Sequence, residues 1–301
     1  MGQAVHGILL LDKPGGLTSN AALQRVRRLL GKPRAGHTGS LDPMATGLLP
    51  LCLGEATRVS GLLLDARKCY EAEARFGQRM DTGDATGQPV AEAPLPVIEP
   101  DSISRLLAAF EGPGEQVPPM YSAVRQQGRR LHELARAGQV VERVARPIHI
   151  HSLDIHRLDR EGMAFRLECS KGTYVRVLIE DMARALGTEG HMTALRRTGV
   201  GSLRLDQAVG LDVLEQLSME QRLAHVLPVE QALMHHPTLT LGEKQVRQLF
   251  HGQRFRLQGP RGQVLRAHGP DGRFLGLVEL DEAGLLRVKR LFPHSAGLAG
   301  G

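Results

Sequence analysis

The stretch GHTGSLDPMATGLLP, residues 36–50, decides how this chain of 301 residues is interpreted. It combines a histidine and an aspartate with three glycines and three hydroxyl side chains, and glycine and proline make it too broken for a long helix or strand. Such loops present polar groups beside closely approaching backbone. Taken alone, Asp42-Pro43 is an ordinary turn initiator and His37 an ordinary loop histidine. Whether they belong to a functional site therefore has to be judged from the rest of the chain.

Regular elements are predicted on both sides of this loop. The apolar run 6–11 indicates a buried strand. Thr18 is typical of a helix N-cap, and apolar residues at helical spacing follow until Gly31 and Pro33 end the helix. Residues 68–78 alternate between apolar and charged side chains, which predicts a strand with one wet face.

The remaining chain predicts an α+β body with a small appended domain. Residues 81–100 are rich in glycine, proline and alanine and indicate a long surface connection. Helices are expected at 102–111, 129–137 and 175–186, strands around 148–150 and 164–169, and two short helical pieces within 211–226. From 239 to 292, short apolar stretches broken by glycine and proline predict a β-rich unit.

Composition narrows the class of protein. Basic residues outnumber acidic ones by 38 to 32, and 32 of the 38 are arginine, which favours a polyanionic partner although genome base composition produces the same excess. The three cysteines form no C-x-x-C pair, which indicates a reducing compartment. No apolar run reaches the ~18 residues of a membrane helix, and the first residues do not form a secretion signal. We therefore expect a cytoplasmic protein without a membrane partner.

Cofactor motifs are weak. His149 and His151 lie two apart on a predicted strand and are either a metal pair or a solvated strand face, and no third ligand supports the metal. Gly31-Lys32 lacks the earlier glycine of a phosphate-binding loop. We expect neither a cofactor nor a metal.

Residues 36–50 resemble the catalytic-aspartate motif of the bacterial tRNA pseudouridine synthase B family. Further segments match this family in order and spacing, and all three tyrosines of the chain fall within the matched segments. The matching segments are GILLLDKP (7–14), KCY (68–70), RMDTGD (79–84), PMYSA (119–123), ARP (145–147), KGTYVR (171–176) and LRR (195–197).

The resemblance implies a pseudouridine-synthase fold, in which helices flank a mixed, largely antiparallel sheet. It divides the chain into a catalytic domain (1–235), with an RNA-binding insertion at about 84–150, and a PUA-like β-barrel that binds RNA (236–293). Residues 294–301 are expected to form a flexible tail. Seven arginines of the terminal domain are expected to contact phosphates of the tRNA acceptor end or to form a solvated basic face. They are Arg254, Arg256, Arg261, Arg266, Arg273, Arg287 and Arg290.

The resemblance also implies a role for each candidate site residue. Asp42 corresponds to the nucleophile and Arg176 to its basic partner, and an arginine this close is expected to lower the pKa of the aspartate. Tyr70 and Tyr174 correspond to residues that contact the base, and Tyr70 is also a candidate for assisting deprotonation at C5. Leu195 corresponds to an apolar wall of the uracil pocket. His37 corresponds to a residue that fills the space left by the displaced base.

The implied activity is isomerisation of uridine to pseudouridine at position 55, in the T loop of tRNA, with the base flipped out. We expect a monomer that acts on the T arm without a guide RNA. Two alternatives stay open: a noncatalytic tRNA-binding or tRNA-folding protein on the same scaffold, and a guide-RNA-dependent synthase. The length of the stretch 84–150 favours a stand-alone enzyme.

Overall fold

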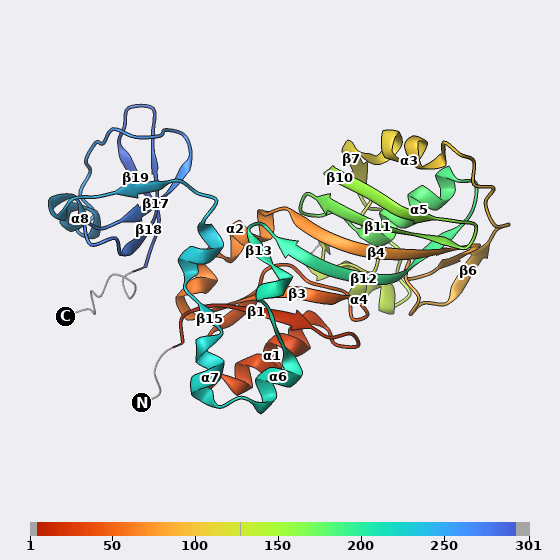
Figure 1. Cartoon of the computed structure of the whole chain (residues 1–301), viewed down its shortest axis with the longest axis horizontal. Helices are drawn as coiled ribbons and strands as arrows, with labels where there is room; N and C mark the ends of the chain where they lie inside the picture. The colour runs from red at the N-terminus through yellow and green to blue at the C-terminus, as the bar shows by residue number, and fades with distance from the viewer. Residues whose placement is uncertain (1–4, 127, 293–301) are drawn as a thin grey trace.

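The computed structural model describes residues 5–126 and 128–292. They form an eleven-stranded mixed sheet that runs through the main body and a separate four-stranded sheet at one end (Figure 1). The main sheet has the strand order β14-β1-β3-β12-β4-β11-β10-β7, and β2, β13 and β15 pair at its sides. The tail predicted for 294–301, and the ends of the first and last predicted domains (1–4 and 293), lie outside the described residues.

The strands of the main sheet are β1 (Gly7–Lys13), β2 (Ala35–His37), β3 (Thr46–Leu53), β4 (Lys68–Phe76), β7 (Gly112–Gln116), β10 (Arg146–Leu158), β11 (Gly162–Cys169), β12 (Gly190–Val200), β13 (Leu203–Arg204), β14 (Val209–Gly210) and β15 (Val226–Leu227). Two small ribbons pair β5 (Gln78–Met80) with β6 (Pro89–Glu92) and β8 (Arg125–Gln126) with β9 (Arg129–Arg130). The small sheet contains β16 (Thr238–Thr240), β17 (Val264–His268), β18 (Phe274–Leu280) and β19 (Leu286–Leu291).

The α-helices are α1 (Ser19–Leu29), α2 (Ser60–Asp65), α3 (Ser102–Phe110), α4 (Leu131–Arg136), α5 (Val175–Ala185), α6 (Leu211–Gln216), α7 (Met219–Ala224) and α8 (Glu243–Phe250), and the 3-10 helices are η1 (Gly54–Val59), η2 (Leu205–Gln207) and η3 (Val229–Leu233). None of the helices in the described part of the chain is long and apolar enough to cross a membrane.

Burial explains the two strand patterns. β1 and β3 are covered on both faces, by α1 and α6 on one side and by η1, α2 and η3 on the other, so residues 8–11 are apolar without interruption. β4 is covered on one face only, where α3 and α5 pack. Its apolar residues point into that core, whereas Glu71 and Glu73 face solvent. The two predicted strands and the helix capped by Thr18 are confirmed, and the Thr18 hydroxyl accepts from the Ala21 amide at 3.1 Å.

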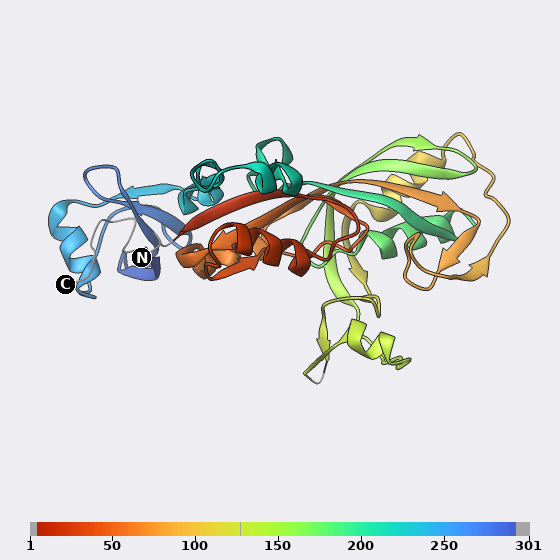
Figure 2. The same ribbon diagram turned by 90° about the horizontal axis from the view of Figure 1, so that it is seen from below.

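Three predicted segments differ from the structure. Strands β2 and β3 extend into the stretch 36–50, so only residues 38–45 form the irregular Asp42 loop. The connection 81–100 contains β6, and the predicted β-rich unit contains helix α8. Residues 117–126 and 128–145, yellow-green in Figure 2, project from one side of the main body.

The C-terminal unit is a four-stranded sheet in the order β16-β17-β18-β19. Its predicted β-rich character is confirmed, and closure of its strands into a barrel stays a prediction. This unit shares a core with the main body, because Phe274, Leu277 and Phe292 cluster with Ile8 and Leu10 of β1.

Candidate active site

Asp42 lies in a loop that the surrounding fold holds in place. The Ser19 hydroxyl, in the first turn of α1, accepts a hydrogen bond from the Leu41 amide at 2.7 Å and donates one to the Leu41 carbonyl at 3.1 Å. The Ala45 amide donates to the Asp42 carbonyl at 3.1 Å. The residues on both sides of the Asp42 carboxylate are therefore fixed by hydrogen bonds, and the carboxylate projects from a tightened turn.

Arg176, in the first turn of α5, grips both oxygens of the Asp42 carboxylate. Its Nε lies 2.9 Å from Oδ2, and its Nη2 donates to Oδ1 at 3.2 Å. The Arg176 side chain is 4% exposed and that of Asp42 is 34% exposed. The proximity predicted from the sequence is confirmed, and the two-point contact is the geometry in which guanidinium and carboxylate bind most strongly.

The rest of the Arg176 guanidinium is held by two backbone carbonyls. Nη2 donates to the Tyr121 carbonyl at 2.8 Å, and Nη1 donates to the Thr82 carbonyl. Gly83 packs against this side chain, since an added Cβ would lie 3.3 Å from the Arg176 Cβ, and its φ of +76° favours glycine. The segments 79–84 and 119–123 therefore have a local purpose, which is to orient Arg176.

The direction of the Asp42 pKa shift differs from the prediction. Burial raises the pKa of Asp42 above its ordinary value, and the nearby Asp84 carboxylate acts in the same direction. The Arg176 guanidinium and the Lys13 ammonium oppose this rise but do not outweigh it. A proton on either oxygen would replace an N–H contact from Arg176, so the arginine still favours the carboxylate form.

Lys13 supports the same loop from below. It is fully buried, and its ammonium donates to the carbonyls of Pro14, Leu17 and Pro43 at 2.8, 2.7 and 3.3 Å. Burial lowers the pKa of Lys13 to about 8, and the Asp42 carboxylate opposes that fall. The matched segment 7–14 contains this lysine, yet the sequence alone assigned it no role.

Tyr70 and Leu195 lie on neighbouring strands beneath the loop. Leu195 of β12 pairs with Ala72 of β4, and Tyr70 pairs with Arg197 two residues further along, so all four side chains point to the same face. Leu195 is 8% exposed and belongs to the apolar cluster against which Tyr70 packs. Burial raises the pKa of Tyr70, and the nearby Asp42 carboxylate adds to that rise, which places the phenol in the electrostatic field of the site.

Tyr174 and His37 border the site from two other elements. Tyr174 precedes α5. Its backbone amide donates to the Gln116 Oε1 at 2.9 Å, and its carbonyl accepts from the Gln116 Nε2 at 3.3 Å. Burial raises the pKa of Tyr174, with Asp42 again adding to the rise. His37 ends β2 opposite Leu51, five residues before Asp42. The fold thus gathers Asp42, Tyr70, Tyr174 and Arg176 and places His37 at the start of the same loop.

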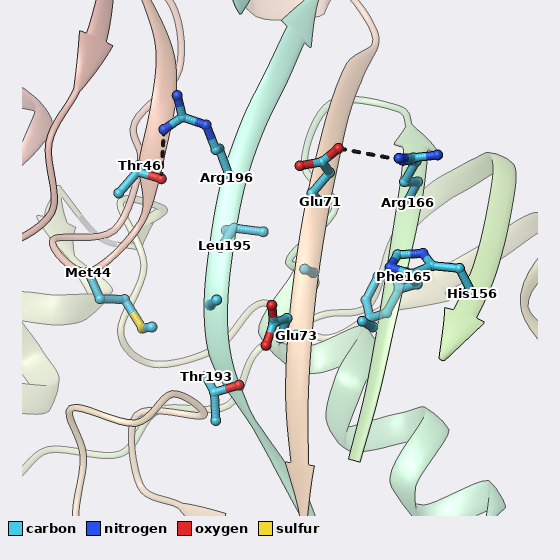
Figure 3. Close-up of a pocket in the computed structure, with 13 residues that line it drawn as sticks. Met44, Thr46, Glu71, Glu73, His156, Phe165, Arg166, Thr193, Leu195 and Arg196 are labelled. Atoms are coloured by element: carbon cyan, nitrogen blue, oxygen red, sulfur yellow. Dashed lines mark hydrogen bonds and ion pairs between the residues drawn. The ribbon is translucent and has the colours of Figure 1, made fainter. Parts of the chain in front are cut away.

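A hollow of about 450 Å³ lies next to this site, between the Asp42 loop and strands β12, β4 and β11 (Figure 3). Its charged lining comes from Glu71, Glu73, Arg166 and Arg196, which alternate with the residues that face Asp42. Arg196 donates to Thr46 Oγ1 at 3.3 Å and pairs with Asp12 at 2.7 Å. Leu195, which is predicted to form the apolar wall of the uracil pocket, and Met44 of the Asp42 loop line the same hollow, so it combines charged and apolar side chains beside the site.

The histidine pair and the arginines of the C-terminal unit are not among the residues gathered at this site. The His149 and His151 rings lie 4.3 Å apart on β10. Arg266, which was predicted to belong to the basic RNA-binding face, is buried instead, and its Nη1 binds Glu230 at 2.6 Å. The other six arginines of that set are exposed.

Comparison with known proteins identifies the family. Residues 27–175 match the N-terminal domain of TruB family pseudouridylate synthases, residues 176–234 match the tRNA pseudouridylate synthase B C-terminal domain, and residues 237–292 match the C-terminal region of pseudouridine synthase II TruB. The chain is similar to tRNA pseudouridine synthase B of Aromatoleum aromaticum, with 52% identity over 95% of this chain and 92% of that protein. It is also similar to the enzyme of that name from Pseudomonas aeruginosa, with 46% identity over 96% of each chain.

Solved structures show the same fold at lower sequence identity. A chain in a Cbf5-Nop10-Gar1 complex superposes with a TM-score of 0.72 at 24% identity, over 95% of this chain and 84% of that one. A chain of an H/ACA RNP bound to a substrate RNA gives a TM-score of 0.69 at 22% identity, over 95% and 85%. The predicted pseudouridine synthase fold is confirmed. On the strength of the full-length relatives, this chain belongs to the TruB family of pseudouridylate synthases.

Proposed function

We propose that this protein isomerises uridine to pseudouridine at position 55 in the T loop of tRNA, without a guide RNA or cofactor. One observation carries the proposal. A carboxylate gripped at both oxygens by a buried arginine lies beside two partly buried tyrosines, in a chain about half identical to proteins named tRNA pseudouridine synthase B.

The chemistry requires a group that can attack an electrophilic carbon and later leave. A carboxylate meets this need, and we assign Asp42 as the nucleophile. Three first steps are open to it: attack on the ribose C1′, attack on the base, or proton abstraction that forms a glycal. Arg176 favours the ionised carboxylate and orients it in each case, because both Asp42 oxygens already receive its N–H groups.

The remaining residues hold the uracil while its glycosidic bond is broken. Tyr70 and Tyr174 offer aromatic contacts, which contribute roughly 1–3 kcal/mol per stacked base. We assign Leu195 to an apolar wall of the pocket and Tyr70 to acceptance of the C5 proton. His37, at the start of the Asp42 loop, is assigned to the space that the flipped nucleotide vacates, where it offsets part of the unstacking cost.

We assign RNA binding to the two outlying parts of the chain. Part of the predicted insertion, residues 117–126 and 128–145, projects from the body, and the domain from 236 to 293 carries six exposed arginines suited to phosphate contacts. Three unpaired cysteines, two of them buried, fit a reducing compartment, and we place the enzyme in the cytoplasm as a monomer.

The decisive experiment incubates the purified chain with a T-arm transcript and no additive, and maps pseudouridine by mass spectrometry. We expect pseudouridine at position 55 with the wild-type chain and none with Asp42→Asn, which should still bind tRNA. Binding without isomerisation by the wild-type chain would identify a noncatalytic RNA-binding protein. Activity that appears only after a second RNA is added would identify a guide-dependent enzyme.

A further inference from the structure

Arg197 connects the two ends of the Asp42 loop. It is 1% exposed on β12, and its Nε donates to the Leu48 carbonyl at 2.7 Å while its Nη2 donates to the Gly39 carbonyl at 3.1 Å. Its backbone packs equally closely, because a Cβ on Gly47 would lie 2.3 Å from the Arg197 carbonyl oxygen, and Gly47 has a φ of +98°. One residue therefore fixes the chain just before and just after Asp42.

The same guanidinium faces the Tyr70 phenol. Arg197 and Tyr70 are direct cross-strand partners in the antiparallel β12–β4 pair, so their side chains lie side by side on one face and the Arg197 charge acts on the phenol. Burial raises the pKa of this phenol, whereas the Arg197 charge opposes the rise. The side chain thus bridges the loop that carries the carboxylate and the strand that carries the tyrosine.

The positive charge of Arg197 is not neutralised locally. Within residues 5–126 and 128–292, no carboxylate lies within ion-pair distance of Arg197, Lys13 or Lys68, and all three bind backbone carbonyls. Burial lowers the pKa of both lysines to about 8, and Arg197 adds to the fall in each. Because an unpaired buried charge is costly, the buried Arg197 guanidinium beside Tyr70 indicates a functional demand for positive potential at this point.

We propose that Arg197 is a positioning residue that fixes the Asp42 loop and the Tyr70 phenol relative to each other and stabilises negative charge on the Tyr70 oxygen. This inference rests on the proposed isomerisation. In its last stage the C5–H bond breaks, its electron pair forms the C5=C6 bond, the former C6=N1 pair takes a proton at N1, and Tyr70 receives the C5 proton. Tyr70 can do so only as a phenolate, which a neighbouring guanidinium favours.

The first test measures tyrosine ionisation without any RNA. The chain has three tyrosines and no tryptophan, so phenolate absorbance is free of indole background, and subtraction of a Tyr70→Phe titration isolates Tyr70. We expect Tyr70 to titrate at higher pH in Arg197→Gln than in Arg197→Lys or wild type. An unchanged Tyr70 titration in a folded Arg197→Gln protein would overturn the proposal.

The second test separates binding from chemistry with Arg197→Lys, which keeps the positive charge but replaces the planar guanidinium by a single ammonium group. We expect kcat to fall by roughly 100-fold while KM for the T-arm transcript changes less than threefold. A kcat within twofold of wild type would overturn the proposal, even if Arg197→Gln fails to fold. If the wild-type chain makes no pseudouridine, the proposed function fails, whereas the titration still tests Arg197.

Discussion

Replacing Arg176 by alanine should both destabilise the protein and stop the reaction. The substitution strands the Asp42 carboxylate, which is 34% exposed, and removes the donor from the carbonyls of Thr82 and Tyr121. Breaking a buried ion pair costs about 3–5 kcal/mol of unfolding free energy. Because Asp42 is partly exposed, we take the lower end of this range, about 3 kcal/mol. Two carbonyls without their charged donor add about 1 kcal/mol. The sum of about 4 kcal/mol corresponds to a fall in Tm of roughly 8–16 °C.

A double-mutant cycle with Asp42→Asn assigns this loss to the pair. In the Asp42→Asn background no charge is stranded, so Arg176→Ala should cost about 2 kcal/mol less than in wild type. Urea unfolding of the four proteins gives the coupling free energy, and pseudouridine mapping gives the loss of activity, expected to exceed roughly 100-fold in Arg176→Ala. Equal costs of Arg176→Ala in both backgrounds would refute the reasoning.

Three further results are expected. Burial lowers the pKa of Lys68 to about 8, so the unfolded chain binds more protons than the folded chain between pH 8 and 10.5. The free energy of unfolding of wild type should therefore rise by about 1.4 kcal/mol relative to that of Lys68→Met between pH 7 and 9. Urea unfolding of both proteins measures this difference, and an equal pH dependence in the two would contradict the prediction. Affinity for tRNA should fall at least ~100-fold between ~50 and ~200 mM salt, and flat binding would argue against arginine–phosphate contacts. The Glu230 carboxylate contacts Arg266 and His268 of the C-terminal domain at 2.6 and 2.7 Å. Glu230→Gln should therefore speed proteolysis at 234–237 and weaken binding of full-length tRNA, while binding of the T-arm transcript stays unchanged. An unchanged proteolysis rate would show that this contact does not fix the domain.

The sequence predicted the main elements wherever burial determines the pattern. Residues 8–11 are uniformly apolar because β1 is covered on both faces, and β4 alternates because one of its faces meets water. Helix α8 was missed because its four-residue apolar spacing is embedded among glycine and proline turns. The strands β2 and β3 reach into the stretch 36–50 because tertiary pairing, with Gly47 at positive φ, overrides the local breakers.

The site was predicted less completely than the fold. The pairing of Asp42 with Arg176, 134 residues apart in sequence, came from motif order and is confirmed by the distances. The supporting roles of Lys13 and Arg197 were invisible, because both act on backbone carbonyls that a sequence does not locate. The burial of Arg266 was missed because charge counting does not separate a solvated arginine from one that joins two domains.

Hydrogen bonds from Ser19, Lys13 and Arg197 hold residues 38–45 in place. This determines whether the enzyme or the RNA changes shape when the two bind. A nucleophile held by the skeleton of the enzyme loses little conformational entropy when substrate arrives. The distortion then falls on the nucleic acid, whose stacked nucleotide has to come to a stationary carboxylate. The enzyme would accordingly select RNAs by the free-energy cost of turning the target nucleotide out of its loop. The deformability of the RNA loop would then be part of what the enzyme recognises.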